Sequence, residues 1–399
     1  MEKFNYIILG AGPSGLTFAQ KLKEKREKSF LILEKENEPG GLCRSAQVDG
    51  SPMDIGGGHF LDNRKKNVLD FIFKFMPEGE WNKISRVSTI KVGDNEIDYP
   101  FEANIWQFPP KICIKYLVSI FKAGIKKKFQ KCPDRFIEWI YWKLGNQISR
   151  DYMIPYNNKI WSTDLNNLGT YWLYKLPDVS LRNTLLSFVF QKPFGKIPGH
   201  AQFYYPKKFG YGEVWKRVAS DIKGSIIYGF QVDSVNFDTL CINGKYQSKC
   251  IVNTIPWREI TGDESVPDNI KENVRKLEYI SLTTSYYNNP QDTKAHWTYF
   301  PDEKLSYHRK LFRFNFLPGS RGYWTETNQK RWKDDGATSF HHPYAYPLNT
   351  IDKPKAIKVI LDWAEAKNVY GLGRWGRWNH MNSDVAVDEA LALAEKVIP

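Results

Sequence analysis

The residues with the clearest chemical signature stand near the start of the chain, where Gly10-Ala11-Gly12-Pro13-Ser14-Gly15 has the G-x-G-x-x-G spacing of a dinucleotide-binding turn. In such a turn Gly10 allows the tight bend, Gly12 lets backbone amides approach a pyrophosphate, and Gly15 lets the next helix pack on its strand. Ser14 belongs to the same turn and is predicted to contact the cofactor with it. Glu34, about twenty residues further on, can accept hydrogen bonds from both ribose hydroxyls. These residue types predict a bound dinucleotide.

A strand, a helix and a second strand must position this turn. Tyr6-Ile7-Ile8-Leu9 is a short apolar run, typical of a parallel strand buried on both faces. Residues 16–28 are predicted to form the helix, whose N-terminal partial positive charge faces the phosphates, and residues 30–33 the second strand. A glycine turn without a ligand is the alternative, and the strand–turn–helix–strand context argues against it.

Two further glycine-rich segments, Pro39–Ser45 (PGGLCRS) and Met53–Phe60 (MDIGGGHF), resemble segments of flavoproteins of the amine-oxidase and sugar-mutase type. The resemblance implies that the first segment runs beside FAD, with Arg44 near the pyrophosphate, and that the second lies against the isoalloxazine ring. FAD therefore replaces NAD as the predicted cofactor. The residues that the resemblance adds to the predicted cofactor site are Gly41, Leu42, Arg44, Gly57, Gly58, His59, Val232, Gly373, Arg374 and Asn382.

Within that superfamily, five segments resemble, in order, the UDP-galactopyranose mutase family. They are Tyr99–Ile105, Pro155–Asp164 with Lys175-Leu176-Pro177, Tyr205–Lys208, Tyr299–Pro301 with Tyr307–Arg309, and Ala345–Pro347. The glycine motifs occur in many flavoenzymes, whereas these five segments in order are much more specific. The resemblance implies a redox-neutral pyranose–furanose interconversion of a nucleoside-diphosphate sugar, in which N5 of reduced FAD attacks the anomeric carbon and forms a flavin–sugar adduct.

The protein's own part in such chemistry would be to position the anomeric carbon and to stabilise the departing diphosphate. Arg309 is the predicted diphosphate clamp, since a planar guanidinium matches phosphate oxygens in bidentate fashion; an exposed strand arginine is the alternative. Tyr346 is expected to donate its hydroxyl to the same group, unless it is core packing. Lys175 aligns with the family's mobile-loop arginine. Lysine keeps the positive charge of that arginine but lacks its planar, forked guanidinium. His380 stands where the family has a second phosphate-binding tyrosine.

The other predicted site residues surround the flavin and the nucleotide. The resemblance places His59 at the flavin face near N5 or O4, and it is counted with the catalytic residues. Tyr156 and Trp161 are predicted to form a platform for the nucleobase, with Asn157 reading the base edge; simple packing is the alternative. Tyr99 and Phe101 complete the predicted substrate site.

Glu102 replaces a glutamine that the family has in the region that holds uracil. An amide both donates and accepts, whereas an ionised carboxylate only accepts and would repel the uracil carbonyls. Guanine presents two adjacent donors, which a carboxylate complements. Glu102 therefore raises the hypothesis that the nucleotide is a purine or is otherwise altered.

The composition limits the other classes of function. The chain has 399 residues with a formal net charge of +13, which favours an anionic partner, but it contains no zinc-finger, helix-turn-helix or RNA-binding signature. Five scattered cysteines without a C-x-x-C pair argue against a metal site and fit a reducing cytoplasm. No apolar run reaches the length of a membrane span. We expect a cytoplasmic protein, and the aromatic share of 15% is compatible with a homo-oligomer.

A region of helical period follows residue 105. Ile114, Leu117, Val118, Phe121 and Ile125 fall at helix spacing, and lysines occupy much of the remaining surface. A basic amphipathic helix of this kind could touch a membrane surface. The favoured interpretation is an ordinary core stripe beneath a solvated charged face.

The predicted fold class is α/β, with a Rossmann-like FAD-binding domain, an inserted helical domain and an antiparallel substrate sheet. FAD binding is assigned to residues 1–95, 201–270 and 351–399, the helical domain with its mobile loop to 96–200, and the sheet to 271–350. The predicted function is an FAD-dependent nucleotide-sugar mutase supplied by an external reductant such as NAD(P)H or a flavin reductase. The alternatives are an amine- or porphyrinogen-type oxidase or desaturase, and a non-catalytic nucleotide-sugar-binding flavoprotein.

Overall fold

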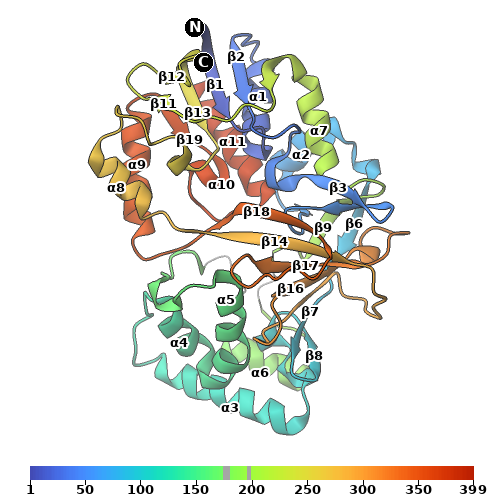
Figure 1. The fold of residues 1–399 in the computed structure, drawn as a ribbon. Coiled ribbons are helices and arrows are strands. Elements are labelled where there is room, and N and C mark those ends of the chain that lie inside the picture. Colours follow the sequence, from blue (N-terminus) through green and yellow to red (C-terminus); the bar gives the residue numbers. More distant parts are fainter. Residues whose placement is uncertain (174–179, 196–198) are drawn as a thin grey trace.

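The structure is a computed structural model that describes residues 1–173, 180–195 and 199–399. A largely parallel sheet with helices on both sides forms the upper body in Figure 1, and both chain termini lie at its outer end. A second sheet crosses below this body, and helices α3 to α6 form a lobe at the opposite end. The mixed helix–sheet architecture agrees with the predicted α/β class.

The first sheet has the strand order β10-β2-β1-β13-β12-β11, and β19 also pairs with β13. Its strands are β1 Glu2–Leu9, β2 Phe30–Leu33, β10 Ile226–Ile227, β11 Val235–Asn236, β12 Cys241–Ile242, β13 Tyr246–Asn253 and β19 Val369–Gly371. β1 is parallel to both β2 and β13, and β13 is parallel to β19. The sheet therefore draws on the first, middle and last parts of the chain.

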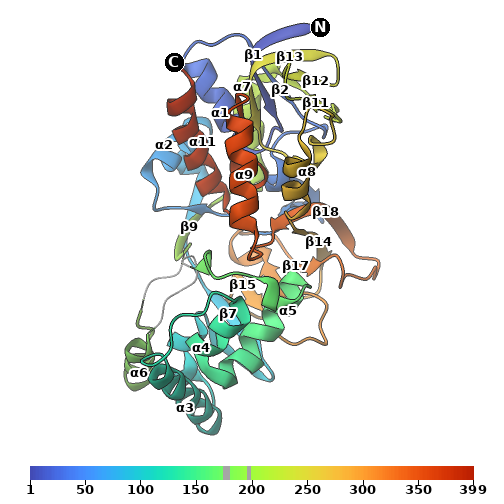
Figure 2. The same ribbon diagram turned by 90° about the vertical axis from the view of Figure 1, so that its left-hand side faces the viewer.

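Successive side chains of β1 point to opposite faces of this sheet, and each face has its own layer of helices. Ile8 packs in the core that contains α1, α2, α7 and α11, whereas Ile7 packs in the core that contains α8 and α9. Figure 2 shows α1 beside α11. The bounds are α1 Pro13–Glu24, α2 Lys66–Phe75, α7 Gly212–Asp221, α8 Asp268–Arg275, α9 Lys353–Glu365, α10 Gly373–Gly376 and α11 Ser383–Val397.

Helix α1 begins and ends earlier than the sequence predicted. It starts at Pro13, because proline already has the φ of the first helical position and needs no N–H there. It ends at Glu24, four residues before the predicted end, since Arg26 takes a left-handed φ of 62°. The Glu27 N–H then donates to the Leu22 carbonyl and closes the helix end.

The second sheet has the order β18-β14-β17-β16-β15-β7-β8. Its strands are β7 Ser88–Val92, β8 Asn95–Asp98, β14 Tyr279–Tyr287, β15 Trp297–Tyr299, β16 Arg309–Phe312, β17 Tyr323–Asn328 and β18 Thr338–Pro347. All its pairings are antiparallel except the one between β15 and β7. The sheet thus extends beyond residues 271–350 and takes in a hairpin that precedes Tyr99.

The lobe contains α3 Pro110–Lys126, α4 Phe136–Ile148, a π-helical turn at Ser149–Met153, α5 Ile154–Trp161 and α6 Leu181–Phe190. The predicted helix at 114–125 is confirmed, but its predicted core stripe is wrong. Ile114, Val118, Phe121 and Ile125 are exposed, and the buried side of α3 consists of Cys113, Tyr116, Ile120 and Ala123.

Two small sheets and several short turns connect these parts. β3 Ser45–Val48 pairs with β4 Ser51–Asp54, and β9 Gln202–Pro206 pairs with β5 Leu61–Asp62 and β6 Trp81–Ser85. The 3-10 turns are Gly41–Cys43, Glu78–Glu80, Phe101–Ala103, Ile105–Gln107, Leu165–Asn167, Lys223–Ser225, Trp257–Glu259 and Arg313–Asn315. Of the helices in the described ranges, none is both long enough and apolar enough to cross a bilayer.

Candidate active site

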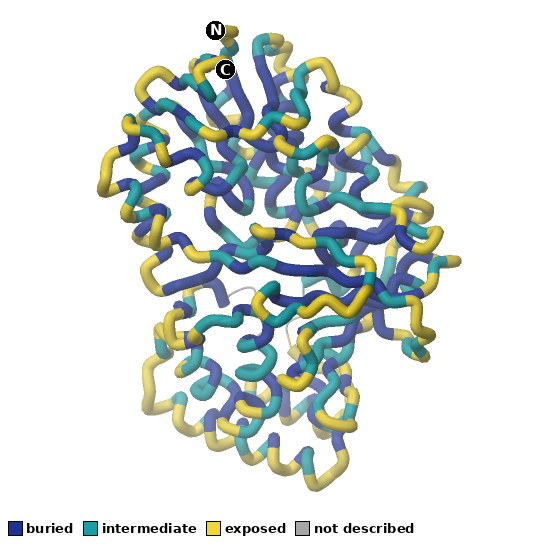
Figure 3. The backbone as a smooth tube through the Cα atoms, viewed as in Figure 1, coloured by how far each residue is buried: buried dark blue, intermediate teal, exposed yellow. Residues whose placement is uncertain are grey.

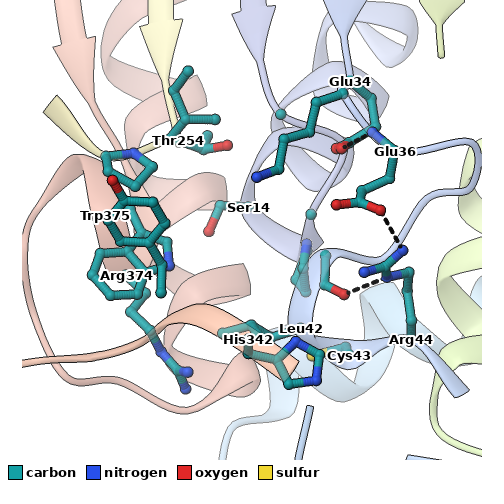
Figure 4. A pocket seen from close by; sticks show the side chains of 18 of the residues that line it. Ser14, Glu34, Glu36, Leu42, Cys43, Arg44, Thr254, His342, Arg374 and Trp375 are labelled. Carbon is teal, nitrogen blue, oxygen red and sulfur yellow. Dashed lines mark hydrogen bonds and ion pairs between the residues drawn. The ribbon is translucent and has the colours of Figure 1, made fainter. Parts of the chain in front are cut away.

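A cavity of about 270 Å³ opens where β1, β2 and β13 end, at the carboxyl edge of the first sheet. Parallel α/β sheets bind their ligands at this edge. Figure 4 shows side chains from several distant segments around the cavity. The predicted cofactor residues that line it are Gly10, Gly12, Ser14, Glu34, Gly41, Leu42, Arg44, His59, Val232, Arg374 and Asn382.

The glycine turn has the geometry that a pyrophosphate needs. Gly10 has a φ of +98°, which favours glycine, and a Cβ on Gly15 would lie 2.1 Å from the Gly10 carbonyl oxygen. A Cβ on Gly12 would meet nothing within 4 Å. The first turn of α1 has neither a side-chain cap nor an acidic residue, so its N–H groups are suited to an anion.

Glu34 sits at the end of β2 and is only 6% exposed. Its two oxygens accept hydrogen bonds from the Ala11 N–H at 2.7 Å and the Glu36 N–H at 2.9 Å. Burial raises the pKa of this carboxyl, while the two backbone bonds lower it. Each oxygen keeps a second lone pair, so the carboxyl can still accept from a ribose hydroxyl. The residues present therefore fit a dinucleotide.

Arg44 lines the cavity but is already partnered. Its Nη1 donates to Glu36 at 3.0 Å and its Nε donates to the Gly41 carbonyl at 3.0 Å, as the dashed lines in Figure 4 indicate. The arginine thus fixes the Gly41 turn against Glu36. A Cβ on Gly41 would lie 3.4 Å from the Cα of Gly12, so the two glycine turns face each other closely.

Four of the predicted cofactor glycines lie outside the cavity lining and shape the backbone around it. Besides Gly15, these are Gly57, Gly58 and Gly373. Gly57 has a φ of +98°, and a Cβ there would lie 2.8 Å from the Glu326 carboxylate. The Gly58 N–H donates to that same carboxylate at 3.0 Å. Gly373 has a φ of +71° and packs on Ser14.

His59 lines the cavity with one ring nitrogen already committed. Nδ1 lies 2.9 Å from the Gly57 carbonyl oxygen, and the ring stacks on Tyr211. Burial, and secondarily the charge of Arg374, lowers the pKa of His59 to about 3. A neutral imidazole must carry its proton on Nδ1 to make that bond, so Nε2 is an acceptor. At neutral pH His59 can accept a hydrogen bond but does not act as a general acid.

Arg309, the predicted diphosphate clamp, is held by a carboxylate that the sequence analysis missed. Arg309 and Glu326 are direct partners in the pairing of β16 with β17. Both Nε, at 2.9 Å, and Nη2 of Arg309 donate to Glu326, which has no exposed surface. Burial alone would raise the pKa of Glu326, but Arg309 and His308 outweigh it and hold the pKa well below its usual range.

Tyr346 and His380 stack on each other with ring centroids 4.5 Å apart. Arg374 lies over the Tyr346 ring at 5.1 Å, so these predicted phosphate ligands adjoin the cavity. Burial, followed by the charge of Glu326, raises the pKa of Tyr346 and keeps its phenol protonated. The ring of Trp161 lies nearly perpendicular to both of these rings.

Tyr99 and Tyr156 converge on Tyr299, each with a ring-centroid distance of 5.4 Å. The guanidinium of Arg86 stacks over Tyr99 at 4.5 Å and donates to the Tyr299 hydroxyl at 3.4 Å. Arg309 interacts electrostatically with Tyr156, Tyr299 and Tyr346. The structure therefore brings two arginines and several phenols together next to Glu326.

The other predicted substrate residues belong mainly to the interior of the lobe. Phe101 is fully buried against Tyr116 and Tyr152. Trp161 is 4% exposed and donates to Asn157 Oδ1, while Asn157 Nδ2 donates to the Met153 carbonyl. These contacts occupy both ends of the Asn157 amide and favour packing for this pair.

Two predicted substrate residues, Glu102 and Lys175, remain to be placed. Glu102 is half-buried and interacts electrostatically with Tyr99 and Tyr152. Lys175 lies outside the described residues. Within the described ranges, no group of three or more His, Cys, Asp or Glu side chains is arranged to hold a metal ion. Arg86, His308 and Glu326 were not predicted; Glu326 stands in the strand-like run Y-W-T-E-T-N, in which nothing local distinguishes its carboxylate.

Sequence comparison with known proteins finds similarity over parts of the chain. A family described as the NAD(P)-binding Rossmann-like domain matches residues 8–75, which hold the end of β1, the glycine turn, α1 and β2. Over 104 residues, the chain is 32% identical to UDP-galactopyranose mutase of Mycoplasma pneumoniae. That match spans about a quarter of this chain and about a quarter of the curated relative, 25% of each.

Solved structures extend the likeness to the whole chain. A crystal structure of reduced UDP-galactopyranose mutase superposes with a TM-score of 0.88 at 20% identity, over 99% of this chain and 95% of that one. A putative protoporphyrinogen oxidase from Exiguobacterium sp. 255-15 superposes with a TM-score of 0.72 at 12% identity, over 99% and 98%. The chain therefore has the fold of UDP-galactopyranose mutase, and the predicted resemblance is confirmed at the level of the fold.

Proposed function

We propose that this protein is an FAD-dependent nucleotide-sugar mutase that interconverts the pyranose and furanose forms of a nucleoside-diphosphate sugar. The observation that carries the proposal is the cluster of Arg309, Arg86 and partly buried tyrosines next to the dinucleotide cavity. An amine or porphyrinogen oxidase has no diphosphate to hold, and an arginine among protonated phenols suits one.

The protein's groups have separate tasks in this proposal. The glycine turn and Glu34 hold FAD, and the reduced flavin, when bound, supplies a nucleophile at N5. Glu326 fixes the plane of Arg309 by accepting from Nε and Nη2, so the guanidinium can present its Nη1 edge to a phosphate oxygen. Tyr346, whose phenol stays protonated, donates a hydrogen bond to the departing diphosphate. His59 offers an acceptor at Nε2 beside the cofactor.

Incubation of the dithionite-reduced protein with UDP-, dTDP- and GDP-sugars tests the proposal directly. The pyranose and furanose forms are then resolved by chromatography. We expect furanose to form only when the flavin is reduced, with no net consumption of reductant. Variant Tyr346→Phe should lower the rate without lowering flavin content, since it removes one hydroxyl and keeps the ring that stacks on His380.

The same assay separates the alternative functions. The oxidase alternative is kept because the fold is shared with a putative protoporphyrinogen oxidase. Oxygen consumption with an amine or a porphyrinogen, and no furanose under reduction, would favour that alternative. Binding of a nucleotide sugar without either reaction would favour the non-catalytic flavoprotein.

The proposal extends to the identity of the base in the substrate nucleotide. Glu102 supports a purine, because a carboxylate complements the two adjacent donors of guanine and repels the carbonyls of uracil. Calorimetric titration of the reduced protein with GDP and UDP tests this choice, and Glu102→Gln is the matched variant. We expect GDP to bind more tightly than UDP and the variant to reverse the order. Tight UDP binding with no GDP binding in the wild type would overturn the purine assignment.

A further inference from the structure

The outward face of α3 carries a continuous row of apolar side chains. Its members are exposed by 46–60% and recur at intervals of four, three and four residues, which places them on one side of the helix: Ile114, Val118, Phe121 and Ile125. Phe129 follows just beyond the helix end and is 83% exposed. The inner face of α3 already supplies the lobe core, and among the described residues this second apolar row is part of no buried core.

Lysines run beside the apolar row. Lys115, Lys122 and Lys126 directly follow Ile114, Phe121 and Ile125, about 100° further around the helix. Lys111 extends their row by one turn, and Lys128 follows the helix end. All five lysines are exposed, and the sequence of α3 contains no Asp or Glu.

Helix α6 widens the same surface. It crosses α3 so closely that a Cβ on Gly124 would lie 2.7 Å from Leu181 Cδ2. Its exposed apolar residues are Leu185, Phe188, Val189 and Phe190, and it too has no acidic residue. Figure 2 shows the two helices side by side at the end of the molecule away from the termini, and Figure 3 shows exposed residues recurring along that edge. We call the exposed faces of α3 and α6, with Phe129, the lobe tip.

We propose that the lobe tip docks on an anionic phospholipid bilayer. Apolar rows flanked by lysines are the pattern of helices that lie in a membrane interface, where the rings enter the headgroup region and the ammonium groups meet lipid phosphates. A second copy of this chain is a poorer occupant, since a two-fold contact brings two lysine-bearing surfaces together and neither α3 nor α6 supplies a carboxylate to neutralise them. This inference does not depend on the reaction proposed for the active site.

Sedimentation of the full chain with sucrose-loaded vesicles tests the proposal. We expect binding to vesicles of phosphatidylcholine and phosphatidylglycerol in a 7:3 ratio, and much weaker binding to pure phosphatidylcholine. Variant Lys111→Gln/Lys115→Gln/Lys122→Gln/Lys126→Gln should lose binding by roughly a hundredfold or more, at about fivefold for each lysine. Variant Phe121→Ser/Phe129→Ser should also lose binding, by about tenfold for each ring.

A matched control removes the same charge from the other body of the protein. Lys3→Gln/Lys223→Gln/Lys249→Gln/Lys355→Gln replaces four exposed lysines on or beside the first sheet, and we expect it to bind vesicles like the wild type. Equal losses in the two lysine variants would show a response to net charge and would overturn the proposal. Normal vesicle binding by the Phe121→Ser/Phe129→Ser variant would also overturn the proposal. So would an effect of that variant on the mass of the protein in sedimentation velocity without an effect on vesicle binding, because that result would assign the lobe tip to self-association.

Discussion

At the residue scale, the pair of Arg309 and Glu326 controls the charge of the candidate substrate site. Glu326 is fully buried, and its carboxylate also accepts from the Gly58 N–H behind the dinucleotide cavity. The pair therefore connects the second sheet to the segment predicted to lie against the flavin. A buried carboxylate that loses its arginine counter-charge is costly, which makes this contact testable by stability alone.

We predict that Arg309→Met destabilises the protein by about 3–5 kcal/mol at neutral pH. In the wild type the pKa of Glu326 is depressed, so its contribution is present above the unfolded pKa of about 4.3 and is lost as the pH falls. In the variant, burial raises that pKa instead, so stability should fall as the pH rises. Urea unfolding between about pH 2 and pH 8 measures both trends, because the wild-type loss falls between the unfolded pKa of Glu326 and its folded pKa of about 2. The double variant Arg309→Met/Glu326→Gln should recover part of the loss; a loss that is independent of pH would contradict the assignment.

His59 leads to a second prediction at this scale. Because burial and Arg374 lower its pKa to about 3, its imidazole should remain neutral, with the proton on Nδ1, throughout pH 5–9. Nitrogen-15 NMR of histidine-labelled protein, with His59→Asn to assign the signal, reports the tautomer directly. Since the unfolded ring protonates near pH 6.5, folding stability from this group is lost as the pH drops below that value. A His59 titration between pH 6 and 8 would contradict the prediction.

Some residues of this site could be selected from the sequence, whereas others could not. Arg309, Tyr346 and His59 could be selected because they stand in short motifs. Glu326 and Arg86 could not, since their roles arise from pairing between β16 and β17 and from the packing of β6–β7 residues against β15. A side chain that acts through a neighbour on another strand leaves little signal in its own segment.

At the scale of elements, α3 shows what a periodic pattern leaves open. Helical spacing of apolar residues establishes that a helix has an apolar face, but it does not identify what covers that face. In α3 the exposed row of Ile, Val and Phe is at least as apolar as the buried face, which consists of Cys113, Tyr116, Ile120 and Ala123. The helix could be predicted from its period, whereas its orientation depended on where α4 and α6 pack.

Gly12 and Gly15, in the turn between β1 and α1, can be compared as a matched pair of alanine variants. Gly12→Ala adds a methyl group with no atom within 4 Å, so we expect the apoprotein to keep its stability while flavin affinity drops about 10- to 100-fold through overpacking of the site. Gly15→Ala places its methyl carbon 2.1 Å from the Gly10 carbonyl oxygen, which must separate α1 from β1. Its apoprotein should therefore melt at a lower temperature. Differential scanning calorimetry and flavin titration compare the two; equal melting temperatures would contradict this account.

At the scale of the whole molecule, the dinucleotide cavity joins parts of the chain that the sequence separates widely. The first glycine turn, the Phe230–Val232 segment, the residues after β13 and the start of α11 all line it. The local unit at residues 4–34 could be predicted because its motif is contiguous. The return of β13 and β19 to the same sheet depends on long-range pairing, for which single segments carry only a general β pattern.

Because the cavity lies in the upper body, FAD should protect the upper body and the lobe from hydrogen–deuterium exchange to different extents. A ligand that binds only the folded state stabilises it by mass action, by about 2.7 kcal/mol at a concentration one hundred times its Kd. The contacts lie in the upper body, whereas α3 and α6 belong to a separate core and, among the described residues, supply none of those that line the cavity. Hydrogen–deuterium exchange should therefore show FAD protecting residues 8–44, 230–256 and 374–386 together, with 110–126 and 181–190 little changed. Equal protection of all these segments would mean that the lobe and the upper body unfold as one cooperative unit.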